Sequence, residues 1–157
     1  MLARVGALVL ALSFVGAANA APPPSPCKLA TTVQVKAAFG GTVGAGKVDN
    51  SIGVPSCHFA VKHSNLGVSG EAIVFITPGQ TAATFKLAKK EVPGAVTVSG
   101  IGNGAFYAAN TGSIEMLKGN TVASAQGVFL DANAHPITSA KMKADVIVLA
   151  KAVAKHL

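Results

Sequence analysis

Residues 113–130 read SIEMLKGNTVASAQGVFL, and this stretch decides the fold class. Strand-like runs over 113–117 and 121–130 flank the sequence KGN at 118–120, which is typical of a tight hairpin between antiparallel strands. Residues 105–109 predict a further strand just upstream of this hairpin. We therefore expect a mainly antiparallel sheet.

Two more strands are expected further upstream. The run EAIVFIT at 71–77 is β-branched and nearly all apolar, which is typical of a central strand. Residues 56–62 alternate between apolar and polar side chains, as a half-buried strand does. Residues 95–99 predict a short strand, whereas 42–55 is rich in glycine and predicts a loop with at most one weak strand.

Three helices complete the expected fold. Thr32 can cap a short helix over 33–39, and Thr77 can cap a second helix over 78–91 that has proline in its first turn. Residues 138–156 carry apolar side chains at helical spacing on one face and lysines on the other. The order of these elements predicts a single α+β domain with about three helices packed on the sheet.

The first 20 residues, MLARVGALVLALSFVGAANA, predict an export signal. Arg4 is followed by an apolar run, and small residues at 18 and 20 match a cleavage site after Ala20. A membrane anchor is the alternative, but the run is shorter than the roughly 20 residues that span a bilayer. We expect a signal peptide at 1–20, a proline-rich lead-in at 21–26 and one domain at 27–157.

Two cysteines remain after this cleavage, Cys27 and Cys57. In an exported protein, a pair with no third cysteine predicts one structural disulfide. The alternative, a reactive or metal-binding pair, lacks the CxxC spacing. Ala21 stands where a lipoprotein needs its acceptor cysteine, so we expect an unlipidated protein that is periplasmic or secreted.

Composition excludes several classes of protein. The 157 residues are 50% hydrophobic and 12% charged, with a formal net charge of +7, which argues against a disordered tail, a collagen-like fibre or a multi-domain enzyme. Arg4 is the only arginine, Tyr107 is the only tyrosine and tryptophan is absent, so nucleic-acid binding is not expected. The lysines predict solvated helix surfaces, or a weak, salt-sensitive contact with anionic envelope polymers.

No catalytic, metal or cofactor motif is found in the sequence. There is no Gly-x-Ser-x-Gly elbow, HxH or HExxH, and GIGNG at 100–104 is followed by a strand rather than by the helix of a phosphate loop. Glu71 and Glu115 lie on different strands, so a glycosidase pair is not expected. The candidates for a ligand or partner surface are His58, Glu71, Tyr107 and Glu115.

The chain resembles small secreted bacterial lipoprotein domains of unknown function. The likeness covers about 27–157 and is carried by the paired cysteines, by Phe59 two residues after the second cysteine, and by GNGAF at 102–106. Members share a Gly-x-Gly-(Asp/Asn)-x-Ala-(Phe/Tyr) segment. The resemblance implies an α+β fold and an envelope location and carries no catalytic residues, and this chain lacks the lipid-acceptor cysteine.

We therefore expect an exported, non-catalytic domain that binds a ligand or another envelope protein. The alternative is a secreted enzyme or enzyme inhibitor that uses dispersed polar residues such as His58, Glu71 and Glu115. The shape of the sheet face that the helices leave open separates these hypotheses. A concave apolar groove there would indicate a ligand site, and a flat polar face would indicate a partner surface or a scaffold.

Overall fold

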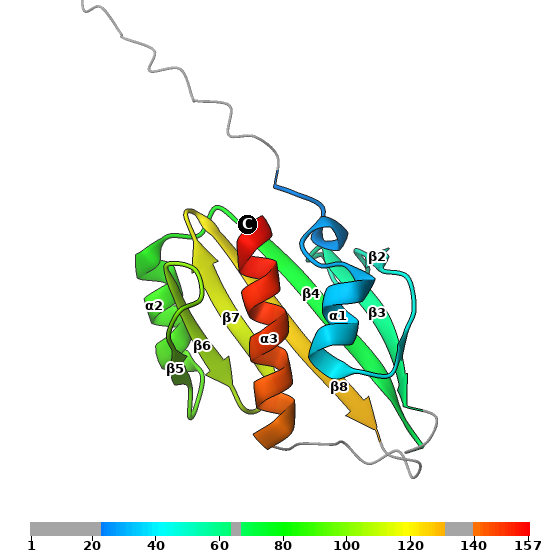
Figure 1. Cartoon of the computed structure of the whole chain (residues 1–157). Coiled ribbons are helices and arrows are strands. Elements are labelled where there is room, and N and C mark those ends of the chain that lie inside the picture. Colours follow the sequence, from blue (N-terminus) through cyan, green and yellow to red (C-terminus); the bar gives the residue numbers. More distant parts are fainter. Residues whose placement is uncertain (1–22, 64–66, 131–139) are drawn as a thin grey trace, which may run out of the picture.

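The structure is a computed structural model that describes residues 23–63, 67–130 and 140–157. Several expectations lie outside these residues: the signal peptide at 1–20, the first two residues of the lead-in at 21–26, most of the turn at 64–67, the polar link at 131–136 with His135, and the first two residues of the helix at 138–156. The described residues form one α+β domain, which confirms the predicted fold class (Figure 1).

Within the described residues, the helical elements are one 3-10 turn and three α-helices: η1 (Pro26–Lys28), α1 (Thr32–Phe39), α2 (Ala82–Glu91) and α3 (Ala140–His156). The strands are β1 (Thr42–Val43), β2 (Lys47–Asp49), β3 (Ser56–His63), β4 (Val68–Pro78), β5 (Val96–Val98), β6 (Gly104–Ala108), β7 (Ser113–Lys118) and β8 (Thr121–Leu130). The loop expected over 42–55 therefore contains two short strands rather than at most one.

All eight strands belong to one sheet, and every pairing is antiparallel. The order across the sheet is β1-β3-β4-β8-β7-β6-β5, with β2 also paired to β3. The run predicted as central, 71–77, is indeed central, because β4 lies between β3 and β8. The predicted hairpin is also confirmed, with Lys118 paired to Thr121 across Gly119 and Asn120.

One face of the sheet is covered by α1 and α3, which lie side by side across it (Figure 1). The buried side chains of α3 repeat at helical spacing, as predicted: Val146, Leu149, Ala150 and Val153. They join a core formed by alternate strand residues, including Cys57, Phe59 and Val61 of β3. Strand alternation sends the other set of side chains to the opposite face, which we call the open face.

The second helix lies on the open face, and its predicted start was wrong. β4 continues through Pro78, which pairs with Thr121, and the helix begins only after Thr81. The pairing of β4 with β3 ends at Phe75, so Pro78 lies where β4 is an edge strand, and proline is tolerated there. Thr81 and Thr84 form a reciprocal capping box that satisfies the backbone N–H groups of both residues, so Thr81 rather than Thr77 is the cap.

The cap of the first helix was misplaced by one residue. Thr31 is the N-cap, and its hydroxyl accepts a hydrogen bond from the backbone N–H of Gln34. The Gln34 side chain accepts one in return from the backbone N–H of Thr31, so a capping box starts this helix as well. The helix ends at Phe39, as predicted, and Gly40 follows it with a φ of 74°.

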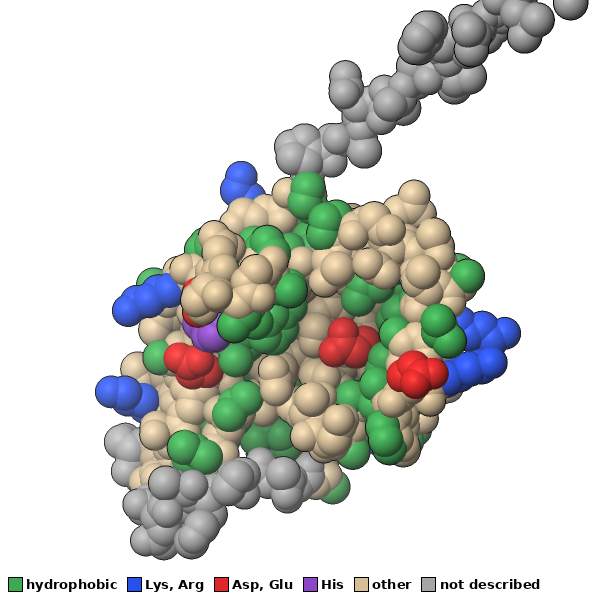
Figure 2. Space-filling view, turned by 180° about the vertical axis from the view of Figure 1, so that it is seen from behind, with side chains coloured by type: hydrophobic (Ala, Val, Ile, Leu, Met, Phe, Trp, Pro, Cys, Tyr) green, Lys and Arg blue, Asp and Glu red, His purple; other side chains and the backbone are tan. Residues whose placement is uncertain are grey.

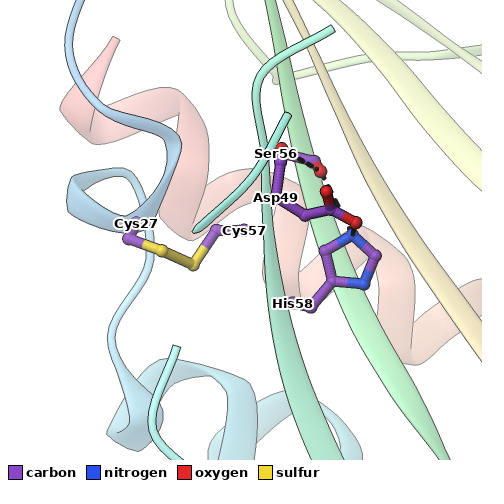
Figure 3. Close-up of a disulfide and its surroundings, with 5 residues drawn as sticks. All are labelled: Cys27, Asp49, Ser56, Cys57 and His58. Atoms are coloured by element: carbon purple, nitrogen blue, oxygen red, sulfur yellow. Dashed lines mark hydrogen bonds and ion pairs between the residues drawn. A yellow bond between two sulfur atoms is a disulfide. The ribbon is translucent and has the colours of Figure 1, made fainter. Parts of the chain in front are cut away.

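The predicted disulfide is present. The sulfur atoms of Cys27 and Cys57 are 1.96 Å apart, and the bond ties η1 to β3 (Figure 3). Leu29 and Ala30, which follow η1, are completely or almost completely buried. The disulfide therefore holds the N-terminal segment against the core.

Candidate functional site

The open face of the sheet is hollowed. Hydrophobic and acidic side chains surround its central depression, and lysines lie toward the edges on both sides (Figure 2). Two adjoining cavities of about 340 and 300 Å³ lie on this face. Because Thr77, Thr111, Glu115 and Val122 line both, the two cavities form one continuous depression, which we call the back groove.

The back groove has a floor of sheet residues and two walls. Its floor is formed by side chains of β4, β6, β7 and β8, including Phe75, Phe106 and Val122. One wall is formed by Phe85 and Ala88 of α2 and by Val92, the residue that follows this helix. The opposite wall is the segment between β2 and β3, which presents Ile52 and Val54. The walls are thus apolar, as ligand pockets usually are.

The helix α2 is held over the sheet by contacts near its start and near its end. The rings of Phe85 and Phe106 are 5.3 Å apart, and the backbone N–H of Gln80 donates to the carbonyl of Asn120 at 2.9 Å. Near the other end, the Lys89 ammonium donates to the hydroxyl of Thr97 in β5. No side chain of α2 is fully buried, so this helix borders the groove without joining the core.

Glu115 is the only ionisable residue that lines the back groove in the described part of the chain. Two hydroxyls donate to the same carboxylate oxygen, Oε1: Ser113 at 3.0 Å and Ser124 at 2.8 Å. Burial raises the pKa of Glu115 above its ordinary value, although these two hydrogen bonds act in the opposite direction. The carboxyl group is therefore easier to protonate than that of an exposed glutamate.

His58 and Glu71 form a second polar cluster on the open face. The His58 Nδ1 lies 2.9 Å from the Glu71 Oε2, and the His58 Nε2 lies 3.1 Å from the Ser56 hydroxyl and 3.9 Å from the Asp49 Oδ2. The Ser56 hydroxyl also donates to the Asp49 carbonyl at 3.0 Å (Figure 3). The backbone N–H of Ser51 holds the pKa of Asp49 below its ordinary value.

The serine in this cluster is poorly placed as a nucleophile. Ser56 is only 1% exposed. Its single proton serves the Asp49 carbonyl, which can only accept, so the Ser56 hydroxyl does not donate to His58. The cluster then ties β2, β3 and β4 together.

The structure brings together only some of the predicted surface residues. His58 and Glu71 are in contact, Glu115 lies apart in the back groove, and Tyr107 is on the other face of the sheet. There the Lys143 ammonium lies 5.1 Å from the centre of the Tyr107 ring. Tyr107 therefore belongs to the packing between the sheet and α3 rather than to the groove.

Sequence reasoning missed the partners of Glu115. Ser113 was not singled out, although it shares the face of Glu115 by strand alternation. Ser124 lies directly opposite Glu115, and this follows from the hairpin, because pairing Lys118 with Thr121 places 115 opposite 124. In the hairpin of β6 and β7, the register likewise places Phe106 opposite Glu115. The strand register within these two hairpins was therefore the sequence signal that could have identified the neighbours of Glu115.

Among the described residues, no group of three or more His, Cys, Asp or Glu side chains could hold a metal ion. In the same residues, no helix is long and apolar enough to cross a membrane. No protein-family model, curated protein or solved structure matches this chain. The back groove and the His58 cluster are the two features of the described residues that point to a function.

Proposed function

We propose that this protein is an exported, non-catalytic domain that binds a small, mainly apolar ligand in the back groove. One observation carries the proposal: a half-buried carboxyl group lies on the floor of a groove with apolar walls. The combined cavities fall in the usual size range of small-molecule sites, roughly 300 to 1,000 Å³. A structural role is a poor explanation, because burying an acid without a positive partner costs stability.

Export is supported by two features. The Cys27–Cys57 disulfide is of the kind that persists in oxidising compartments, and residues 1–20 have the pattern of a signal peptide. The resemblance to small secreted bacterial lipoprotein domains fits the same location. A partner protein in the envelope is the competing occupant of the open face, but a concave groove suits a small molecule better than a flat partner surface.

Filling the groove should abolish binding. In Ala88→Trp a large ring replaces an exposed alanine on the wall formed by α2, and we expect the affinity for the uncharged dye Nile red to fall by about tenfold or more. The measurement is the rise in dye fluorescence on titration with purified protein. Circular dichroism should show unchanged secondary structure, because the residue is exposed.

Ala83→Trp is the matched control. Ala83 is also exposed on α2, but it does not line the groove, so this variant should bind Nile red as the unmodified protein does. Equal loss of binding in both variants would mean that the dye binds to the exposed surface of α2 rather than in the groove. Absence of dye binding to the unmodified protein would refute the proposed function.

The alternative function, a secreted enzyme or inhibitor, is supported by the contact between His58 and Glu71 and by Ser56 beside them. Serine hydrolases use a serine, a histidine and an acid in such a chain. We expect no covalent labelling by a fluorophosphonate probe, because Ser56 is enclosed and its proton serves a carbonyl group. Labelling detected by mass spectrometry, and lost in Ser56→Ala, would favour the enzyme.

A further inference from the structure

Glu115 has no positive partner within the described residues. The ion pairs there join His58 to Asp49 and Glu71, and Lys141 to Asp145. α2, β4, β6, β8 and the segment before β3 surround the groove and contribute no second ionisable side chain to its lining. The carboxylate form of Glu115 is therefore a negative charge that the fold itself does not neutralise.

The two oxygens of this carboxyl group are in different situations. Oε1 accepts both serine hydroxyls, whereas Oε2 has no hydrogen-bond partner among the described residues. In the same residues, no fully buried side-chain oxygen or nitrogen lacks a partner. Oε2 is therefore accessible, and since Glu115 lines both cavities, the groove is where a donor can reach it.

Two aromatic side chains of the groove floor flank Glu115 in the sheet. In the sheet register, Phe106 lies directly opposite Glu115 on one side, and Ser124 followed by Phe75 lies on the other. Aromatic faces attract organic cations, and they also bury the carbon body of a ligand. The groove thus offers one anionic acceptor within walls that have no other charge.

On the basis of the groove-binding function above, we propose that the ligand is an organic amine. Its ammonium group would donate to the Glu115 Oε2, and its apolar body would lie along the groove walls. A neutral alcohol could make the same hydrogen bond but would leave the negative charge unpaired, and a hydrogen bond between charged groups is roughly twice as strong as a neutral one. The affinity should therefore favour the amine.

Displacement of Nile red from the purified protein by two ligands of equal length tests this assignment. Octylamine should displace the dye at a concentration roughly tenfold or more below that of octanol, because only the amine is charged. In Glu115→Gln, which keeps the size of the side chain and removes its charge, this preference should disappear. A change in the affinity of this variant for Nile red would shift both displacement concentrations equally, so the ratio of the two concentrations is the measured quantity.

Glu91→Gln is the matched control. Glu91 is the last residue of α2, is exposed and does not line the groove, so this variant changes the net charge equally and should keep the preference for octylamine. Loss of the preference in Glu91→Gln would show that the preference for octylamine depends on the net charge of the protein rather than on contact with Glu115. This result would overturn the assignment.

Acid should weaken amine binding through the same group. Protonation of Glu115 removes its charge, and since burial raises its pKa, the preference for octylamine should decline at a higher pH than an exposed glutamate would give. If octanol binds as well as octylamine, or if octanoic acid binds better, the amine assignment is wrong while the groove function stands. If Nile red itself does not bind, the groove function fails.

Discussion

Removal of the Cys27–Cys57 disulfide is expected to lower the free energy of unfolding by about 3 to 4 kcal/mol. The bond closes a loop with a sequence separation of 30, and a loop of that length restricts the unfolded chain by this amount in the chain-entropy treatment. In Cys27→Ala/Cys57→Ala, the midpoint of thermal unfolding should therefore fall by about 10 °C. Urea denaturation followed by circular dichroism gives the free energy directly.

The loss should come from the loop constraint and not from the alanines themselves. Reducing the unmodified protein with dithiothreitol should lower its stability by a similar amount, and the reductant should leave the double variant unaffected. An equally stable double variant would mean that the packing of Leu29 and Ala30 holds the N-terminal segment without the bond.

The second large effect is expected at Gly70 in β4. A Cβ atom placed there would lie 2.0 Å from the carbonyl oxygen of Val128 and 2.7 Å from the Cα of Phe129, both in the neighbouring strand β8. Backbone atoms cannot move aside without breaking the pairing of these strands. Gly70→Ala should therefore cost about 3 kcal/mol, as overpacking at buried positions does, and should lower the denaturant midpoint accordingly.

Gly44 gives a matched comparison. A Cβ atom at this position would lie 3.6 Å from the Ala60 Cβ, which is ordinary contact, and Gly44 does not have a positive φ. Gly44→Ala should be neutral, or more stable by about 0.4 to 1 kcal/mol through the unfolded state. Similar stabilities of the two variants would show that β4 and β8 can separate locally at Gly70.

Local patterns were enough to predict most of the fold. The helical spacing before His156 marked the buried face of α3, and Lys118-Gly119-Asn120 marked the hairpin between β7 and β8. Each of these signals depends on residues that are close in the sequence. The disulfide was predictable for another reason, since Cys27 and Cys57 have no other cysteine to pair with.

Helix starts were harder to predict because neighbouring residues compete for the same role. Thr77-Pro78 and Thr81 both resemble helix entries, and pairing of β4 with β8 draws the first into the sheet. Thr31 and Thr32 can both serve as a helix cap. Thr31 is the cap because Gln34, which completes the capping box, lies three residues after it. Long-range pairing decides the first case, and a side-chain contact decides the second.

The candidate site was named only in part. Glu115 was recognised as a candidate, but its burial depends on α2, whose place over the open face no local pattern specifies. His58 and Glu71 meet because β3 and β4 pair in the register that puts Ile73 opposite His58. Tyr107, the fourth candidate, lies on the core side of the sheet, apart from the other three.

The pairing of β4 with β8 also has a consequence for how the chain reaches its native state. The other long strands pair with strands that are close to them in the sequence. The pairing of β4 with β8 instead joins residues that are far apart in the sequence, from Pro78 with Thr121 to Ser69 with Leu130. Closing so large a loop is slow, because its entropy is lost before its contacts form. The floor of the back groove includes residues of both strands, Phe75 of β4 and Val122 of β8. The back groove is therefore complete only once β4 has paired with β8, and a ligand that contacts both strands would oppose their separation.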